Sequence, residues 1–444
     1  MKTGISGFPE FLPNEQIVFT RMLDQIKHYF EMYGFIPMDT PAVERISTLL
    51  SNGNDSEIYG LYRIADENSK KDLGLRFDLT VPLARYVSSK FGHLVFPHRR
   101  YQIGPVWRGE RPQFGRYRQF YQCDIDVVGE GELSLACDAE IVKVFTELLR
   151  SLGIPSFTTK MNNRKILQYF LVTLVAEENI NDLIRVIDKR DKITDDEFTA
   201  AVSELGVKTS DMDKLYTFLS ANSLTKNADI LDWLKGLDLG AKFTDSVLEF
   251  EYVINLLKKF GMEDDNVKIS MGLARGLTYY TGNVFETVFD NDVAGIGSIA
   301  AGGRYDNLVS TMSDKNIQGV GASIGLTRML AKLLEQKLIT CNRSSTADLL
   351  VTNQENNYLG IYMDLSTKFR NLGIKTETYL QNESLGDQLT YANKKGIPFV
   401  LIANESELQS NVAILRNMYT KEQISIKTDC IEADIADKIK TSNK

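Results

Sequence analysis

The sequence predicts an α+β protein in which an antiparallel-sheet domain is interrupted by a helical insertion and followed by a small α/β domain. With 444 residues, the chain exceeds one ordinary hydrophobic core, which favours two or three domains. Short apolar runs alternate with Gly, Pro and Arg between Asp72 and Asp126, and glycine-spaced apolar strands return from Gly272 to Gly325, as is typical of antiparallel sheets. Between them, residues 160–260 lack proline and carry apolar side chains at helical spacing.

The first expected elements are a helix and a strand-like turn. Apolar residues recur every three or four positions over residues 18–33, which predicts a helix with one buried face. Gly34 ends the pattern, because glycine favours helix termini. Phe35–Met38 then leads into an extended turn around Pro41.

One strand, one further helix and the helical insertion are expected next. Alternation over Arg76–Thr80 predicts a strand that places Asp78 and Thr80 on one face. Residues 141–152 return to helical spacing, as does the insertion, bounded at 160–262. The stretch 161–265 holds 13 basic and 20 acidic residues, and such charge usually belongs to a solvated surface. One apolar helical face of the insertion consists of Leu167, Phe170, Leu171, Leu174 and Val175.

A polar hinge at residues 341–346 separates the last domain, which we assign to residues 347–444, from the sheet domain at 1–340. The last domain alternates apolar strands with helical patterns, and this order predicts a small α/β fold. The expected strands and helices are Leu349–Val351, Tyr358–Leu372, Leu385–Lys395 and Phe399–Ile402.

Composition excludes several classes of protein. The net charge of −8 argues mildly against a nucleic-acid binder, although local charge decides that question. Three histidines are too few for a His-rich metal site, and the four cysteines show no metal-ligand spacing, so we expect thiols in a reducing compartment and no metal site from protein spacing. The chain shows neither a signal-peptide pattern nor an apolar run long enough to span a membrane, so a cytoplasmic protein is expected.

The strongest local signal is the segment Arg99–Arg118, which carries six arginines, one glutamate and no lysine. Guanidinium groups bind phosphate bidentately and stack on flat rings, which lysine does not do. Interleaved aromatic residues, Trp107, Phe114, Tyr117 and Phe120, offer stacking surfaces for a base. The segment therefore favours a nucleotide or nucleic-acid phosphate site; an arginine-rich hairpin paired with the acidic insertion is the alternative.

Polar side chains are expected on one face of the strand that follows. Gln122, Asp124 and Asp126 share that face by the two-residue period of a strand. Burying such a face is costly unless a ligand or partner satisfies it, and carboxylates and amides suit an amine-bearing small ligand. Purely structural hydrogen bonding remains the alternative for this face and for Asp78 and Thr80.

Glycine-rich segments form a third group. In Gly272–Gly282, glycines allow close backbone approach to a ligand, and Arg275, Tyr279 and Tyr280 supply charge and hydroxyls, although the tyrosines alone suit a packed core. The glycines of 319–325 suggest a dinucleotide-binding turn only weakly, because they come late and lack the early βαβ context. A glycine-rich strand running into a helix that carries Arg328 in its first turn fits a phosphate contact better.

These segments together resemble the histidyl-tRNA synthetases, a family of class II aminoacyl-tRNA synthetases. RYQIGPVWRGERPQFGRYRQFYQCDID resembles motif 2, GASIGLTRML motif 3, and Tyr33–Glu44 motif 1. ARGLTYYTG and AGGRYDNLV resemble the two histidine-specific motifs, and the tail resembles the family's anticodon-binding domain. The family usually has an acid where this chain has Thr278, which leaves the role of that carboxylate open.

The resemblance implies a class II antiparallel-sheet catalytic domain with a helical insertion, plus a C-terminal α/β anticodon-binding domain. It implies an enzyme, a histidine–tRNA ligase, that uses ATP and Mg²⁺ to form histidyl-adenylate and then charges the histidine tRNA. Motif 1 in this fold builds a homodimer interface, and no membrane partner is implied. The rival readings are a non-catalytic, histidine-binding paralogue that regulates histidine biosynthesis, and a dehydrogenase that uses the 319–325 glycines.

Site roles follow from the same resemblance. Arg108, Arg275 and Arg328 match the catalytic arginines, and Gln113 matches a contact of the tRNA acceptor end. The implied ATP-binding residues are Arg108, Glu110, Arg116, Phe120 and Arg328. The implied histidine-binding residues are Asp78, Leu79, Thr80, Arg108, Gln122, Asp126, Arg275, Tyr279, Tyr280 and Tyr305.

Overall fold

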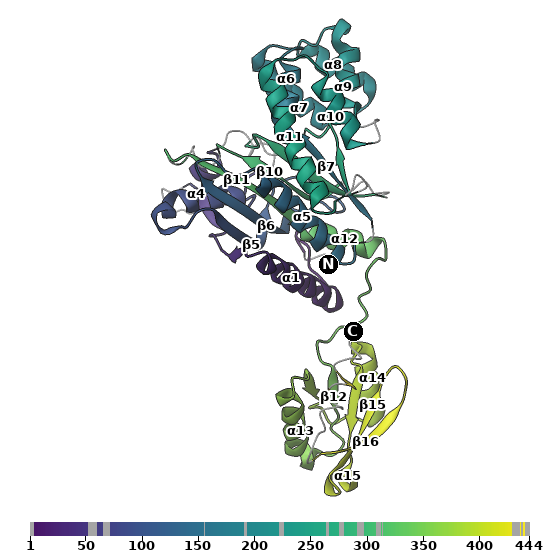
Figure 1. The fold of residues 1–444 in the computed structure, drawn as a ribbon. Coiled ribbons are helices and arrows are strands. Elements are labelled where there is room, and N and C mark those ends of the chain that lie inside the picture. The colour runs from purple at the N-terminus through teal and green to yellow at the C-terminus, as the bar shows by residue number, and fades with distance from the viewer. Residues whose placement is uncertain are drawn as a thin grey trace. The chain divides into compact units, whose positions relative to one another are not determined.

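The computed structural model divides into two compact units: residues 1–9 with 24–338, and residues 10–23 with 339–444. Both appear in Figure 1. Within the part of the chain that the structure describes, no helix is long and apolar enough to cross a membrane. The described residues are 4–51, 60–64, 72–154, 156–190, 193–221, 226–262, 266–274, 279–290, 297–307, 312, 314–428, 436 and 438–439.

An eight-stranded sheet forms the centre of the first unit, with the strand order β1-β5-β6-β11-β10-β9-β7-β8. The strands from β5 to β7 pair antiparallel, whereas, among the described residues, the edge strands β1 and β8 pair parallel to their neighbours. This confirms the predicted antiparallel sheet. The strands are β1 (Ile36–Pro37), β5 (His98–Trp107), β6 (Gln119–Glu130), β7 (Phe157–Asn163), β8 (Val267–Ile269), β9 (Asn283–Phe289), β10 (Ser298–Tyr305) and β11 (Ile317–Gly325).

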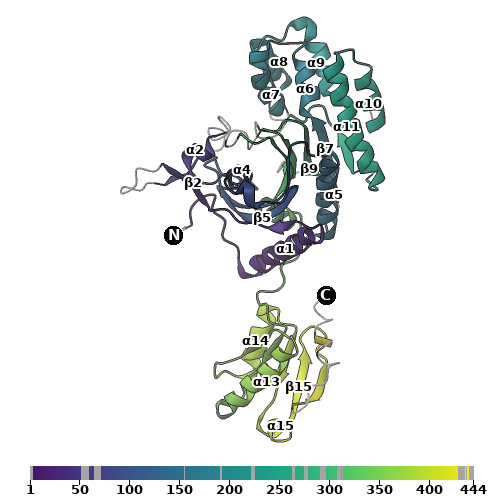
Figure 2. The same ribbon diagram turned by 60° about the vertical axis from the view of Figure 1, so that its left-hand side comes forward.

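Helices cover both faces of this sheet, and Figure 2 shows α4 on its concave side and α5 outside. The apolar residues of α4 pack with Val128 and Tyr305 in one core. The expected first helix is α1, and Gly34 follows it with φ +74°. A small antiparallel sheet, β2-β4-β3, lies beside α2. These elements are α1 (Pro13–Met32), β2 (Val43–Arg45), α2 (Ile46–Leu49), β3 (Arg63–Ile64), β4 (Leu73–Leu75), α4 (Thr80–Lys90), α5 (Ala136–Ser151) and α12 (Leu326–Glu335).

The strand predicted over Arg76–Thr80 is wrong. Strand β4 ends at Leu75 and α4 begins at Thr80, so Asp78 lies in the turn between them. The Asp78 Oδ1 atom accepts the backbone N–H of Val81 at 3.1 Å, which satisfies one of the unpaired donors of the first helical turn. Pro82 is tolerated there because the first-turn N–H groups have no helical acceptor. Local hydrogen bonding therefore outweighed the alternating pattern.

A helical segment separates β7 from β8. It begins at Arg164, because residues 160–163, which were expected to be helical, continue β7 in the main sheet. The Asn163 side chain accepts the N–H of Lys165 and caps the first helix. The predicted apolar face from Leu167 to Val175 is buried. The helices are α6 (Arg164–Leu171), α7 (Ile180–Asp188), α8 (Asp195–Glu204), α9 (Met212–Leu219), α10 (Asn227–Lys235) and α11 (Ala241–Lys259).

The second unit contains a five-stranded sheet of order β13-β12-β14-β15-β16. Strands β13, β12 and β14 are parallel, as the predicted α/β pattern requires, whereas β15 and β16 add an antiparallel hairpin that the sequence did not reveal. Its elements are β12 (Leu349–Val351), α13 (Leu359–Asn371), β13 (Thr376–Thr378), α14 (Leu385–Lys395), β14 (Phe399–Ile402), α15 (Glu405–Gln409), β15 (Val412–Asn417) and β16 (Gln423–Lys427).

Candidate active site

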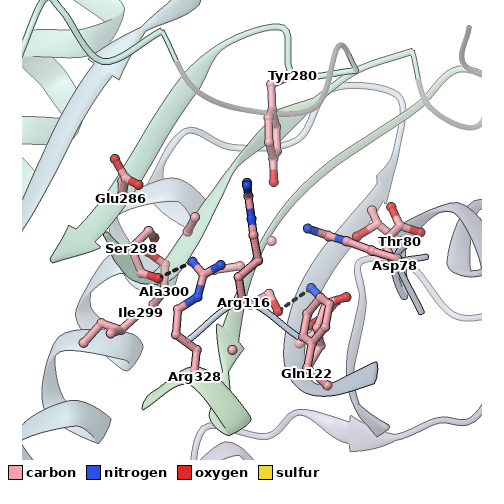
Figure 3. Close-up of a pocket in the computed structure, with 18 of the residues that line it drawn as sticks. Asp78, Thr80, Arg116, Gln122, Tyr280, Glu286, Ser298, Ile299, Ala300 and Arg328 are labelled. Carbon is pink, nitrogen blue, oxygen red and sulfur yellow. Dashed lines mark hydrogen bonds between the residues drawn. The ribbon is translucent and has the colours of Figure 1, made fainter. Parts of the chain in front are cut away.

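A polar cavity of about 330 Å³ opens over β6, β10 and β11 in the first unit. Figure 3 shows Glu286 and Ser298 at one end, Asp78, Thr80 and Gln122 at the other, and Arg116 and Arg328 between them. Most residues expected to contact ATP or histidine line this one cavity. They are Asp78, Thr80, Arg108, Glu110, Arg116, Phe120, Gln122, Asp126, Tyr279, Tyr280, Tyr305 and Arg328.

The polar face predicted for β6 is present. Gln122, Asp124 and Asp126 all line the cavity, and the last two are almost fully buried. Antiparallel pairing places Gln122 opposite Gly325, Asp124 opposite Ser323 and Asp126 opposite Gly321. The Gln122 Nε2 atom donates to the Ser323 hydroxyl at 2.9 Å (Figure 3). Two neighbouring strands thus build one continuous polar wall.

Asp126 is fixed from two sides. Arg100 Nη2 lies 2.6 Å from Asp126 Oδ2, and the Tyr305 hydroxyl donates to Asp126 Oδ1 at 2.8 Å. Burial raises the pKa of Asp126, while Arg100 and the Tyr305 hydrogen bond oppose that shift by stabilising the carboxylate. Burial and the Asp126 charge also raise the pKa of Tyr305, which keeps its hydroxyl protonated as a donor.

Asp124 lies between these residues and carries a perturbed carboxyl. Burial is the main cause that raises the pKa of Asp124 to about 7, and the charges of Asp126 and Asp78 add to it. Arg100 and a hydrogen bond from Ser323 act in the opposite direction. Near neutral pH, this group therefore changes charge easily when a neighbouring donor arrives.

Glycine makes room for the wall on β10 and β11. A Cβ at Gly321 would lie 2.0 Å from Asp126 Oδ1, and one at Gly319 would lie 2.2 Å from the Tyr305 ring. At Gly303 it would lie 2.8 Å from the Tyr280 ring. The glycines of 319–325 therefore do not form a dinucleotide turn; they are part of strand β11 and admit the side chains of the pocket.

Tyrosines and the start of α4 close one side of the cavity. The Tyr279 and Tyr280 rings meet edge to face, with centroids 4.8 Å apart. Burial raises the pKa of both phenols, so both remain neutral hydrogen-bonding groups. Asp78 and Thr80 line the same cavity although no strand holds them, because the turn before α4 brings them there.

Three arginines converge at the other side. Arg108 Nε donates to the Phe77 carbonyl at 3.1 Å, and its guanidinium carbon lies 5.1 Å from the centroid of the Phe120 ring. Arg116 Nε lies 2.9 Å from Glu110 Oε2. Arg328 Nε and Nη1 donate to the carbonyls of Gly115, at 2.8 Å, and Ser298, at 3.0 Å (Figure 3). Backbone contacts thus orient two of these guanidinium groups.

Other expected residues lie elsewhere. Leu79 is buried and its carbonyl accepts from Arg100, while Gln113 is exposed in the loop between β5 and β6. Arg99 pairs with Glu140 of α5 at 2.8 Å, so the arginine-rich segment does not act as one phosphate site. Arg275 and Thr278 lie outside the described residues.

Several residues that line the cavity have no role that the sequence alone indicates. Strand alternation places Asp124 on the correct face, but the sequence indicates no ligand for a third carboxylate. Ser323 lies opposite Asp124 on β11. The alternation of Gly319, Gly321, Ser323 and Gly325 could have predicted that Ser323 shares a strand face with these glycines. Glu286 and Ser298 come from β9 and β10, and their position in the cavity depends on pairing between distant strands. Only the strand register brings these residues together.

Comparison with known proteins places the chain in one family. The family model described as histidyl-tRNA synthetase matches residues 7–329, and the model for an anticodon binding domain matches residues 348–438. A histidine–tRNA ligase of Clostridium tetani is 42% identical over 426 residues, covering 96% of each chain. That of Finegoldia magna is 40% identical over 422 residues, covering 94% of this chain and 96% of the relative.

A solved structure agrees with this assignment, and a second shares the fold. The histidyl-tRNA synthetase of Nostoc sp. PCC 7120 is 35% identical, with a TM-score of 0.88 over 100% of this chain and 99% of that one. A Bacillus halodurans protein, titled ATP phosphoribosyltransferase regulatory subunit/histidyl-tRNA synthetase, is 20% identical with a TM-score of 0.73, covers 88% of this chain and 96% of its own, and shares the fold. The chain belongs to the histidyl-tRNA synthetase family.

Proposed function

We propose that this protein is a histidine–tRNA ligase, which activates L-histidine with ATP as histidyl-adenylate and transfers the histidyl group to its tRNA. One observation carries the proposal: a single cavity joins a wall of carboxylates and hydroxyls to a cluster of three arginines. The first half suits an amino acid with an ammonium group and ring nitrogens, and the second suits a polyphosphate. Adenylation needs both ligands side by side.

The arginine side of the cavity would bind ATP. Arg108 would grip the α-phosphate, and Arg116 and Arg328 the β- and γ-phosphates, because guanidinium groups contact phosphate oxygens bidentately. Phe120, which already lies beside the Arg108 guanidinium, offers a ring for the adenine, with Glu110 next to it. Backbone hydrogen bonds to Arg108 and Arg328 support this role, since they fix both groups before ATP arrives.

The opposite wall would bind histidine. The assigned residues combine acids for the ammonium group and ring N–H groups with neutral hydroxyls for orientation. Leu79 would contribute through its position beside Asp78 and Thr80 at the start of α4. The other proposed contacts are Asp78, Thr80, Arg108, Gln122, Asp126, Arg275, Tyr279, Tyr280 and Tyr305.

In the chemical step, the histidine carboxylate attacks the α-phosphorus in line with the departing pyrophosphate. Negative charge then grows on the equatorial oxygens of that phosphorus, and fixed guanidinium groups stabilise it more than they stabilise the bound substrates. We assign this task to Arg108 and, by resemblance, to Arg275 from the opposite side, with Arg328 holding the leaving pyrophosphate. Gln113 would then face the acceptor end of the tRNA.

Magnesium fits one end of the cavity. Glu286 is largely buried, lines the cavity and lies at the end where the Arg328 guanidinium reaches Ser298 (Figure 3). A single carboxylate together with phosphate oxygens and waters is the usual donor set for Mg²⁺ in nucleotide sites. Glu286 would hold the ion, which when bound would neutralise charge on the ATP phosphates.

The remaining partners follow from the domain order. We propose a catalytic domain at 1–340, interrupted by the 160–262 insertion, and an anticodon-binding domain at 347–444 that reads the histidine tRNA. We also propose a cytoplasmic homodimer formed through Tyr33–Glu44. The exposed apolar residues Ile36 and Val43, 51% and 39% exposed, support that interface.

The decisive experiment is ATP–pyrophosphate exchange measured with each amino acid in turn, followed by charging of tRNA. We expect ATP–pyrophosphate exchange with histidine and with no other amino acid. The rival regulatory paralogue would bind histidine without exchange, so histidine binding to folded protein with no exchange above background would overturn the proposal. Arg328→Ala tests the role of the arginine cluster, and we expect it to lower the rate of exchange by about 10²-fold.

A further inference from the structure

Among the described residues, the proposed histidine wall contains three carboxylates, those of Asp78, Asp124 and Asp126. Arg100 occupies one oxygen of Asp126 and the Tyr305 hydroxyl the other. Asp78 accepts the Val81 N–H at the start of α4. Both carboxylates therefore help to hold the fold around the cavity, which limits how freely either can reorient toward a ligand.

Asp124 is the third carboxylate of this wall. Its side chain is 2% exposed and lines the cavity. The Ser323 hydroxyl hydrogen-bonds to this carboxylate while accepting from Gln122 Nε2, so a short relay runs from the amide to the acid. Among the described residues, the second oxygen, Oδ1, has no hydrogen-bond partner, and neither has Gln122 Oε1. Two acceptors from alternate positions of one strand thus remain open on the same wall.

The surroundings of Asp124 favour a ligand that donates a hydrogen bond. The charged and titratable groups around it are Arg100 from β5, Asp126 from β6, Asp78 and Arg76 from the segment before α4, and the neutral phenols of Tyr279 and Tyr280. Arg100 is itself paired with Asp126, so its charge is shared. A buried carboxylate oxygen without a donor is costly, and a ligand N–H would remove that cost.

We propose that Asp124 is a specificity-determining residue of the histidine pocket, and that its Oδ1 atom accepts a hydrogen bond from an imidazole N–H of the substrate. The inference rests on the proposed function and deepens it. The imidazole ring is the only part of histidine that other amino acids lack, and it presents N–H groups at its edge. A site built to accept such a donor rejects analogues that lack it.

Ser323 supports this contact from the neighbouring strand. Ser323 lies opposite Asp124 in the β6–β11 register, its hydroxyl accepts from Gln122 Nε2, and a hydrogen bond from Ser323 favours the charged form of Asp124. Ser323 is thus a positioning residue. The raised pKa of Asp124 is consistent with an acid that becomes fully charged only when a donor binds.

The test measures equilibrium binding of L-histidinol by calorimetry, which needs no chemistry, together with exchange kinetics on the full-length protein. Asp124→Asn and Asp124→Ala should weaken histidinol binding and raise KM for histidine by about tenfold to hundredfold, the scale of one charge-assisted hydrogen bond. KM for ATP should stay within about threefold. Ser323→Ala, which keeps the acceptor, should have a smaller effect on histidine.

A second readout uses the two ring-methylated histidines as competitors of exchange. The parent protein should discriminate between them, because only one ring nitrogen faces Asp124, and Asp124→Ala should reduce that discrimination. Asp124→Asn, nearly isosteric, guards against a folding defect, which thermal melting would reveal. If folded variants bind histidinol and discriminate as the parent does, Asp124 has no such role. If the parent protein showed no histidine-dependent ATP–pyrophosphate exchange, the proposed function itself would be overturned.

Discussion

Arg100 and Asp126 form an ion pair inside the main sheet, with Nη2 and Oδ2 2.6 Å apart and side chains 0% and 4% exposed. The pair joins two neighbouring strands directly beneath the proposed histidine pocket, since Arg100 lies opposite Asp126 in the β5–β6 register. Arg100 belongs to the arginine-rich segment but lines no part of the cavity. Its contribution is to hold a carboxylate that does.

Arg100→Met should destabilise the protein strongly, because it leaves the Asp126 carboxylate buried without its cation. We expect a loss of about 3–5 kcal/mol in the free energy of unfolding, measured by urea denaturation. Arg63→Met, which breaks an exposed pair with Asp72, is the matched control and should cost under about 1 kcal/mol. Similar losses for the two variants would contradict a special role for the buried pair.

Gly321→Ala should damage the proposed histidine pocket. The new Cβ would lie 2.0 Å from Asp126 Oδ1 and 2.7 Å from the Ile125 carbonyl, so the carboxylate must move. We expect KM for histidine to rise about tenfold or more and stability to fall by about 1–3 kcal/mol, the usual cost of overpacking. Gly92→Ala, where a Cβ meets nothing within 4 Å, is the control for an added methyl group. An unchanged KM for histidine would contradict this prediction and would show that Asp126 can move without loss of histidine binding.

Asp124 should make stability depend on pH. Its pKa, raised to about 7 from an ordinary value near 3.8, means that the native state holds the proton more tightly than the unfolded chain. This contribution is fully present below pH 3.8 and is lost as pH rises through 7. Asp124→Asn removes the titration, so the variant should gain roughly 2–4 kcal/mol relative to the parent between pH 5 and pH 8.

Urea denaturation of both proteins at several pH values between 5 and 8 measures this difference directly. Because all other groups are shared, their titration cancels in the comparison. Asp245→Asn, at an exposed position of α11, is the matched control for the loss of one carboxyl. A difference between Asp124→Asn and the parent that stays constant with pH would mean that Asp124 titrates alike in both states.

Ile36→Asp should weaken the proposed homodimer. Ile36 lies on edge strand β1 and is 51% exposed, so a charge there costs little within one subunit but would be buried in the proposed interface. We expect sedimentation velocity to show dissociation at concentrations where the parent stays dimeric. Leu248→Asp, 49% exposed on α11, is the control and should leave the association unchanged. A parent protein that is monomeric throughout would refute the interface.

The sequence predicted the architecture well where periodicity was long. The helix ending at Gly34, the polar face of β6 and the α/β order of the tail are all present. It failed at Arg76–Thr80, where five alternating residues suggested a strand but the Asp78 side chain satisfies the start of a helix. It also missed the β15–β16 hairpin, although β15 begins with the apolar run Val412–Leu415 and polar and apolar residues alternate in β16.

Some residues of the candidate site could be predicted from the sequence, and others could not. Residues in recognisable motifs, such as Arg108 and Arg328, could be named from the sequence, although nothing in it showed which backbone carbonyls hold them. Arg100 and Glu286 could not be assigned. An arginine of a charged segment faces either a ligand or a buried acid. Which of the two it faces depends on the side of the sheet to which its position in the strand points and on the pairing with neighbouring strands, and the local sequence does not reveal that pairing.

The glycines of β10 and β11 limit how this pocket can be redesigned. An amino-acid pocket is usually enlarged by truncating the residues that line it, but Gly303, Gly319 and Gly321 have no side chain to remove. Shortening Tyr305, a large side chain that lines the cavity, would add space but would release the hydroxyl that holds Asp126. Shortening Tyr305 would therefore sacrifice the anchoring of an acidic group, and filling a glycine position would displace Asp126, Tyr305 or Tyr280, so the cavity resists changes of size in both directions.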